Sequence, residues 1–140
     1  MDLKGYLDSK ADEYNNKSFI DKDPIQIPHA YTSKEDIEIS GFLTATIAWG
    51  NRKSIINNSN KIMKLFENEP YNFILNHTEK DLKHFIKFVH RTFNGFDLIQ
   101  FVKSLKNIYK NHSGLENVFS QNIKDEAMHN SIHQVKKIFF

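Results

Sequence analysis

The chain has 140 residues, of which 39% are hydrophobic and 12 are phenylalanine, so it can form one domain with an aromatic-rich core. The absence of cysteine excludes disulfides, thiol nucleophiles and thiolate metal sites, and the lack of a long apolar run excludes a membrane-spanning helix. The net charge of +2 is uneven: residues 1–50 hold 5 Lys/Arg and 9 Asp/Glu, whereas residues 51–140 hold 14 and 8, which fits either a phosphate-binding face or a solvated lysine-rich surface.

The N-terminal region predicts one helix and then an irregular connector. The helix is expected over about residues 2–17, and its polar, acidic composition is unlike a secretory signal, so we expect a cytoplasmic protein. Pro24 and Pro28 disfavour a regular helix and bias the residues before them, including Ile27, to extended geometry. The apolar Ile25 and Ile27 indicate that this connector packs against the core.

Two amphipathic helices follow, joined at a short polar turn. Ser33 is a good N-cap for the first, and Gly50 can end it in a left-handed conformation. Asn51 can cap the second, which is expected from about residue 52 to residue 68, before Pro70.

The second half predicts further short helices. A capping signal at Thr78 and Asp81 starts a helix that continues to Val89, and the Asn94-Gly95 pair favours a turn. A hairpin is not expected there, because the flanking residues follow helical spacing. Three more helices are expected, over about residues 98–109, 115–119 and 125–138.

The sequence therefore predicts an all-α fold, an orthogonal array of about six to eight short helices without a strand, in a single domain over residues 1–140. The helical spacing predicts a common core of Leu43, Ile47, Ile62, Phe66, Phe85, Val89, Phe101, Leu105 and Ile108. The end at Ile138, Phe139 and Phe140 is apolar, which predicts exposed apolar surface, self-association and a position as the N-terminal portion of a longer architecture.

Two turns carry the candidate site. Trp49, Asn51 and Arg52 form one, and His90, Arg91 and Asn94 form the other. Each combines an aromatic with amide or cationic donors, which can hold phosphate or contact a base. We expect Arg52 to contact phosphate with Trp49 packed beneath it, and the six basic residues between Lys83 and Lys110 to support weak DNA binding. The alternative is that both turns only cap and anchor helices.

No complete catalytic centre or cofactor site is recognised, so an enzyme is not the favoured interpretation. His129 and His133 are spaced i, i+4, but the residue after the first is not the Glu of a zinc-protease motif, so no metal is expected. Asp21 and Asp23 flank a turn, where solvated acids are common. No phosphate-binding glycine loop or nucleophile motif is present.

The strings DPIQIPHAY, DIEISGFLTATIAWGNRKSII, PYNFILNH and FVHRTFNG resemble a conserved bacterial family of unknown function that is common in Bacteroidota. The resemblance covers nearly the whole chain. Members of that family are usually almost twice this length, which implies that these residues are its N-terminal part.

Residues 37–66 are also similar to an early helix–turn–helix segment of helix-hairpin-helix DNA glycosylases. That resemblance implies a turn near the DNA minor groove at Trp49, Asn51 and Arg52, although glycosylases usually carry Gln and Thr there. Their glycine-rich hairpin and catalytic Asp have no counterpart in this chain, so it would hold part of a DNA-binding scaffold.

The leading functional hypothesis is a glycosylase-like helical domain that binds nucleic acid without catalysis. The alternative is a non-catalytic protein-interaction or scaffold domain. A metal-dependent hydrolase is a third class, which only scattered His and Asp residues support.

Overall fold

The computed structural model describes residues 2–121, 123 and 128–140. This part of the chain contains ten helices, one of them a 3-10 helix, and a single two-stranded hairpin, so the all-α class is confirmed and the expected number of helices was too low. In chain order the elements are α1 (Leu3–Tyr14), α2 (Lys17–Ile20), α3 (Gln26–His29), α4 (Lys34–Thr46), α5 (Arg52–Leu65), α6 (Pro70–Asn76), η1 (Asp81–Lys87), β1 (Val89–His90), β2 (Phe93–Asn94), α7 (Gly95–Asn111), α8 (Leu115–Ser120) and α9 (His129–Phe139).

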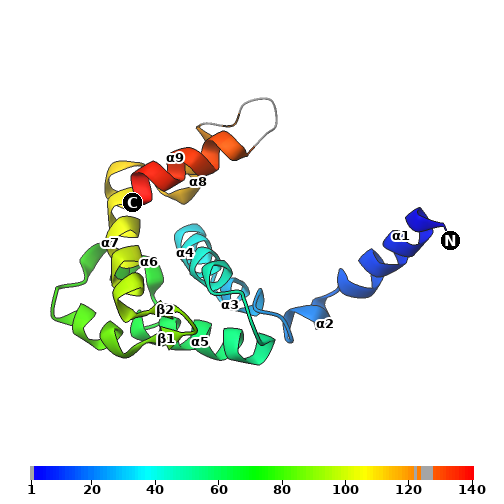
Figure 1. Cartoon of the computed structure of the whole chain (residues 1–140), viewed down its shortest axis with the longest axis horizontal. Helices are drawn as coiled ribbons and strands as arrows, with labels where there is room; N and C mark the ends of the chain where they lie inside the picture. Colours follow the sequence, from blue (N-terminus) through cyan, green and yellow to red (C-terminus); the bar gives the residue numbers. More distant parts are fainter. Residues whose placement is uncertain (1, 122, 124–127) are drawn as a thin grey trace.

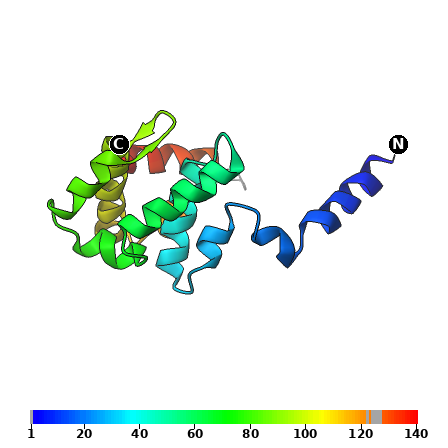
Figure 2. The same cartoon turned by 90° about the horizontal axis from the view of Figure 1, so that it is seen from below.

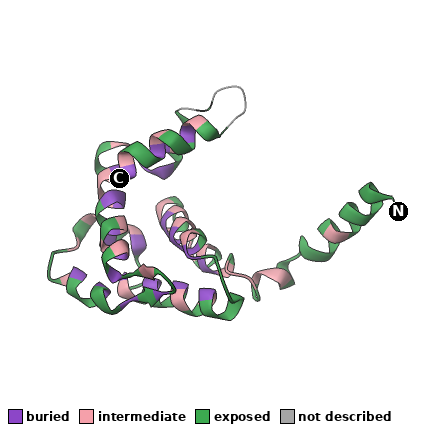
Figure 3. Cartoon of the chain, in the orientation of Figure 1, coloured by how far each residue is buried: buried purple, intermediate pink, exposed green. Residues whose placement is uncertain are grey.

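The helices from α3 onward form one body, and α1 extends away from it. Figures 1 and 2 show this separation from two directions. Helix α4 packs against α3, α5, α6 and α8, while α7 packs against η1, α6, α8 and α9. Neither α1 nor α2 contains a buried residue, and Figure 3 shows buried positions gathering on the inward faces of the other helices.

The core joins α4, α5, α6, η1 and α7 through aliphatic and phenylalanine side chains. Seven of the nine predicted core residues are buried in one cluster: Leu43, Ile47, Ile62, Phe66, Phe85, Leu105 and Ile108. Phe101 is only partly buried and packs against this cluster. Val89 is 61% exposed, so its assignment to the core was wrong.

The error at Val89 follows from local geometry. The predicted helix from Asp81 is a 3-10 helix that ends at Lys87, and the chain then becomes extended. In a strand, neighbouring side chains point to opposite faces, so Val89 points outward and His90 points inward.

The segment around the two prolines also differs from the expectation. Ile27 is helical rather than extended, because α3 places Pro28 within a first turn, where a missing N–H is tolerated. The connector does pack against the core, as predicted, through the buried Ile27, although Ile25 is exposed.

The capping predictions hold at α4 and α5, but not at η1. Ser33 accepts from the backbone of Asp36, and Asn51 accepts from the backbone of Ser54 at 3.3 Å. Asp81 accepts from both the backbone and the hydroxyl of Thr78, and these bonds hold the pKa of that carboxyl below its usual value. The N-cap of η1 is Lys80, which makes no side-chain capping bond.

A hairpin forms where the sequence predicted none. β1 and β2 are antiparallel, with His90 opposite Phe93, and the turn falls at Arg91, which has a φ of 56°. Asn94-Gly95 is therefore not the turn: Asn94 caps α7 and Gly95 begins it. A Cβ at Gly95 would lie 2.2 Å from the carbonyl oxygen of Phe85, so close packing against η1 explains this glycine.

The C-terminal aromatic residues pack better than predicted. Phe139 is buried, its ring centroid lies 4.6 Å from that of Phe101, and its carbonyl accepts from Ser104 at 2.6 Å. Phe140 alone is largely exposed, at 80%, so the predicted apolar surface is smaller than expected. No helix within the described residues is long and apolar enough to cross a membrane.

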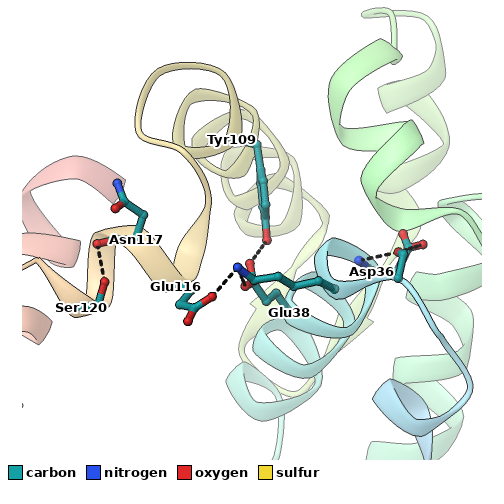
Figure 4. A network of polar contacts seen from close by, with 8 residues as sticks. Asp36, Glu38, Tyr109, Glu116, Asn117 and Ser120 are labelled. Carbon is teal, nitrogen blue, oxygen red and sulfur yellow. Dashed lines mark hydrogen bonds and ion pairs between the residues drawn. The ribbon is translucent and has the colours of Figure 1, made fainter.

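A polar network ties α4 to α7 and α8 (Figure 4). The hydroxyl of Tyr109 donates to Glu38 at 2.7 Å, and Lys34 forms ion pairs with Glu38 and Glu116. Burial, together with the neighbouring Glu38 carboxylate, raises the pKa of Tyr109 well above its usual value. The hydrogen bond thus joins α7 to α4, and the ion pair of Lys34 with Glu116 adds α8.

We predict that Gly95→Ala lowers the free energy of unfolding by about 3 kcal/mol, because the new methyl group meets backbone atoms that have little room to move. Gly41→Ala is the matched control: its Cβ would lie 3.7 Å from Pro28, and removing a helical glycine should stabilise by up to about 1 kcal/mol. Urea unfolding of both variants measures this. Equal stability of the two would contradict the close-packing explanation.

We predict that Tyr109→Phe lowers stability by about 1.5–3 kcal/mol near pH 8, since it removes a hydrogen bond to a carboxylate. Because the pKa of Tyr109 is higher in the folded state, the protonated hydroxyl contributes fully to stability at a pH below the unfolded-state pKa of about 10. This contribution decreases as the pH rises from that value toward the folded-state pKa. The difference between wild type and variant should therefore shrink above about pH 10. Tyr71→Phe, whose ring packs 5.3 Å from that of Tyr109, controls for the loss of a phenol, and an identical pH profile in both variants would contradict the assignment.

Candidate nucleic-acid interface

The two candidate turns, 41 residues apart in sequence, meet through the imidazole of His90. Its Nε2 donates to the carbonyl oxygen of Trp49 at 3.2 Å, and its Nδ1 accepts from the side-chain amide of Asn58 at 2.9 Å. The ring is 2% exposed and lies edge-on to the Trp49 indole, with centroids 5.9 Å apart. Since a carbonyl only accepts, these contacts define the Nε2–H tautomer.

The exposed side of this junction is an arginine stacked on a tryptophan. The guanidinium carbon of Arg91 lies 5.0 Å from the ring centroid of Trp49, within the range of a cation–π interaction. Gly50 has a φ of +105°, and a Cβ there would lie 3.1 Å from the Arg91 guanidinium. The positive φ favours glycine here, and a larger residue would also displace the Arg91 side chain. We define Trp49, Gly50, His90 and Arg91 as the Trp49 corner.

Arg52 lies elsewhere than predicted. We expected it above Trp49, but Arg91 occupies that position, and the Arg52 guanidinium lies 6.0 Å from the ring centroid of Phe19. Arg52 begins α5 and, with Lys22 and Lys53, surrounds a shallow hollow of about 440 Å³, which no carboxylate among the described residues lines. Lys22 and Lys53 had no distinguishing signal in the sequence beyond their charge.

The two asparagines of the prediction cap helices. The side-chain oxygen of Asn94 accepts from the backbone of Phe96 and Asp97, and Asp97 accepts in return from the backbone of Asn94. Asn51 caps α5 in the same way. Both amide oxygens are thus engaged by the backbone, which leaves the amide N–H groups as the donors that a ligand could use.

Helix α5 extends the basic surface from the Trp49 corner. It carries Arg52, Lys53, Lys61 and Lys64 and has no acidic residue over its 14 positions. The predicted basic stretch further along is less uniform, because Lys103 pairs with Glu79 and other cations lie on different elements. The positive charge available near the corner therefore comes mainly from α5 and from the segment that leads to Arg91.

The histidine and carboxylate candidates do not assemble. His129 and His133 are exposed on α9. In the part of the chain that the structure describes, no three His, Asp or Glu side chains gather as metal ligands would. Asp23 accepts from the backbone of Ile25 at 3.0 Å, as expected of a turn residue.

Comparison with known protein families gives a match. A family model described as Protein of unknown function (DUF2400) matches residues 23–140. The chain belongs to this family. The match includes every candidate-site residue and begins after α1 and α2. No curated protein and no solved structure gives a significant match.

We predict that His90→Ala lowers the free energy of unfolding by about 2–4 kcal/mol, because it opens a cavity and leaves the Trp49 carbonyl and the Asn58 amide without their partner. His133→Ala, an exposed histidine on α9, should change stability by less than about 0.5 kcal/mol. Thermal unfolding compares the two. A His90 variant as stable as the His133 variant would show that the imidazole does not hold the turns together.

Proposed function

We propose that this member of the DUF2400 family binds DNA through the Trp49 corner and the basic N-terminal end of α5 at Arg52 and Lys53, without sequence preference and without catalysis. The observation that carries the proposal is the convergence of two distant turns on one exposed site. That site presents an arginine stacked on a tryptophan, next to the basic N-terminal end of α5.

The corner has the features of a preorganised phosphate contact. Arg91 lies in the two-residue turn of the hairpin and has positive φ. This backbone conformation costs a non-glycine residue about 1–3 kcal/mol. The indole beneath the guanidinium limits its motion while its N–H groups stay available to an anion. Less side-chain entropy is then lost on binding.

Trp49 adds a second kind of contact. It is 40% exposed despite its size, so part of the indole remains open beside the guanidinium. An aromatic surface next to cations favours nucleic acid over a simple anion, because bases or sugars can pack on the ring while phosphates contact the cations. Arg52 and Lys53 extend the phosphate-binding surface onto α5.

The relationship to helix-hairpin-helix DNA glycosylases is part of the proposal. Residues 1–140 would then form one portion of a DNA-binding scaffold that is located in the cytoplasm and lacks a base-excision centre. The similarity of residues 37–66 and the position of Trp49, Asn51 and Arg52 between two packed helices support it. No catalytic residue is assigned.

A protein-interaction role is the alternative, and α1 favours it. Leu3, Leu7 and Tyr14 are each more than half exposed on a helix that extends away from the body. Such an apolar stripe is suited to a protein partner. Self-association through the C-terminal end belongs to the same alternative, supported by Phe140.

We predict that Arg91→Gly weakens binding to a labelled 20-base-pair duplex by about tenfold at low salt, since it removes a charged phosphate contact. The slope of log affinity against log salt should fall by about 0.9. Glycine accepts positive φ, so the fold should be retained, and thermal unfolding verifies this. Fluorescence anisotropy at several salt concentrations measures the binding.

Lys110→Ala is the matched control, an exposed cation at the far end of α7. It should change duplex affinity by less than about twofold, because it lies outside the proposed face. An equal loss in both variants would indicate diffuse attraction to a basic protein. No binding by wild type at low salt would refute the proposed function.

A further inference from the structure

A second hollow lies farther along α5. It is open to solvent between the C-terminal half of α5 and the end of η1 and has a volume of about 330 Å³. Its lining consists of Lys61, Lys64, Leu65, His84, Lys87 and Phe88. Lys64 lies about 18 Å along α5 from Arg52, and Lys87 precedes Arg91 by four residues. Both α5 and the segment after η1 therefore lead from the hollow toward the Trp49 corner.

The hollow combines an apolar floor with a cationic rim. Leu65 and the buried Phe88 form the floor, while the three lysines and His84 are exposed around it. No carboxylate lines the hollow, and none of the three lysines forms an ion pair with another residue that the structure describes. Three like charges around one opening repel each other, which an anionic ligand would relieve.

This combination defines the chemistry of a ligand. A free inorganic anion would leave the apolar floor in contact with water, and an uncharged apolar ligand would leave the rim unpaired. A flat apolar body bearing one phosphate satisfies both. The volume is at the lower limit of about 300–1,000 Å³ for small-molecule sites, which suits a single nucleotide unit.

We propose that this hollow holds one unstacked nucleotide of a DNA single strand, with its base on Leu65 and the edge of Phe88 and its phosphate among Lys61, Lys64 and Lys87. The proposal rests on the proposed DNA-binding function and adds a preference for unpaired strands. A paired base within a duplex is covered on both faces by its neighbours, so it would not reach the floor. Binding at the hollow therefore requires a single-stranded segment.

The first test compares strands in anisotropy measurements with a labelled 15-nucleotide oligothymidine and with the 20-base-pair duplex. Lys64→Met/Lys87→Met keeps the apolar stems but removes two charges. It should weaken single-strand binding by about tenfold or more, reduce its salt slope by about 1.4, and change duplex binding much less. Lys53→Met, on α5 but outside the hollow, is the matched control and should weaken the binding of single-stranded and duplex DNA alike. An equal loss of single-strand and duplex binding in the double variant would overturn the proposal.

The second test asks whether the floor contributes. In two-dimensional NMR spectra of the whole chain, thymidine 5′-monophosphate should shift the amides of residues 61–65 and 84–88 and the His84 ring. Thymidine and inorganic phosphate, at the same concentration, should shift them much less. Leu65→Gln should abolish the difference between the nucleotide and phosphate. If phosphate alone shifts these signals as strongly as the nucleotide, the lysines only cover apolar surface and bind anions without selectivity, and the proposal is wrong.

The two proposals fail differently. Loss of duplex binding in Arg91→Gly together with an unresponsive hollow would leave DNA binding at the Trp49 corner and refute the nucleotide site. Absence of any wild-type DNA binding would refute both.

Discussion

The candidate interface depends on the hydrogen bonds of the buried His90 imidazole. This ring forms hydrogen bonds both to the turn after α4 and to the middle of α5, through the Trp49 carbonyl and the Asn58 amide. Because both ring nitrogens have partners, the hairpin has a single favourable position relative to these helices. The position of Arg91 over the indole follows from that of its neighbour, His90.

The hairpin in turn depends on how closely α7 approaches η1. Gly95 lets the first turn of α7 contact the backbone of Phe85 and Ile86, and the capping box of Asn94 and Asp97 fixes where α7 begins. Because the end of η1 and the start of α7 lie close together, the segment between them has to reverse direction within a few residues. A two-residue turn with a left-handed Arg91 achieves this reversal. Local strain at the interface is thus compensated by packing in the core.

The sequence predicted the parts of this protein that depend on local pattern. Helical spacing identified α4, α5 and α7 and most of the core, and the caps at Ser33 and Asn51 follow from side-chain chemistry within one turn. It also selected both turns of the candidate site. It failed where distant contacts decide: Asn94-Gly95 has the composition of a turn, but tertiary packing assigned it to a helix start. The pairing of Trp49 with Arg91 rather than Arg52 likewise depends on the fold, since no local pattern relates residues 42 positions apart.

Helix α1 has a different physical status from the remainder of the protein. An isolated helix of 12 residues is marginal in water, because the nucleation cost is repaid by few hydrogen bonds. With no buried side chain, α1 gains little from tertiary packing, so its opening is independent of the cooperative unfolding of the body. The helical content of α1 should therefore depend on what it contacts, and α1 should be the first segment to exchange its amide hydrogens. A partner surface that covers Leu3 and Leu7 would stabilise the helix. The entropic cost of ordering α1 would then reduce the affinity of that partner.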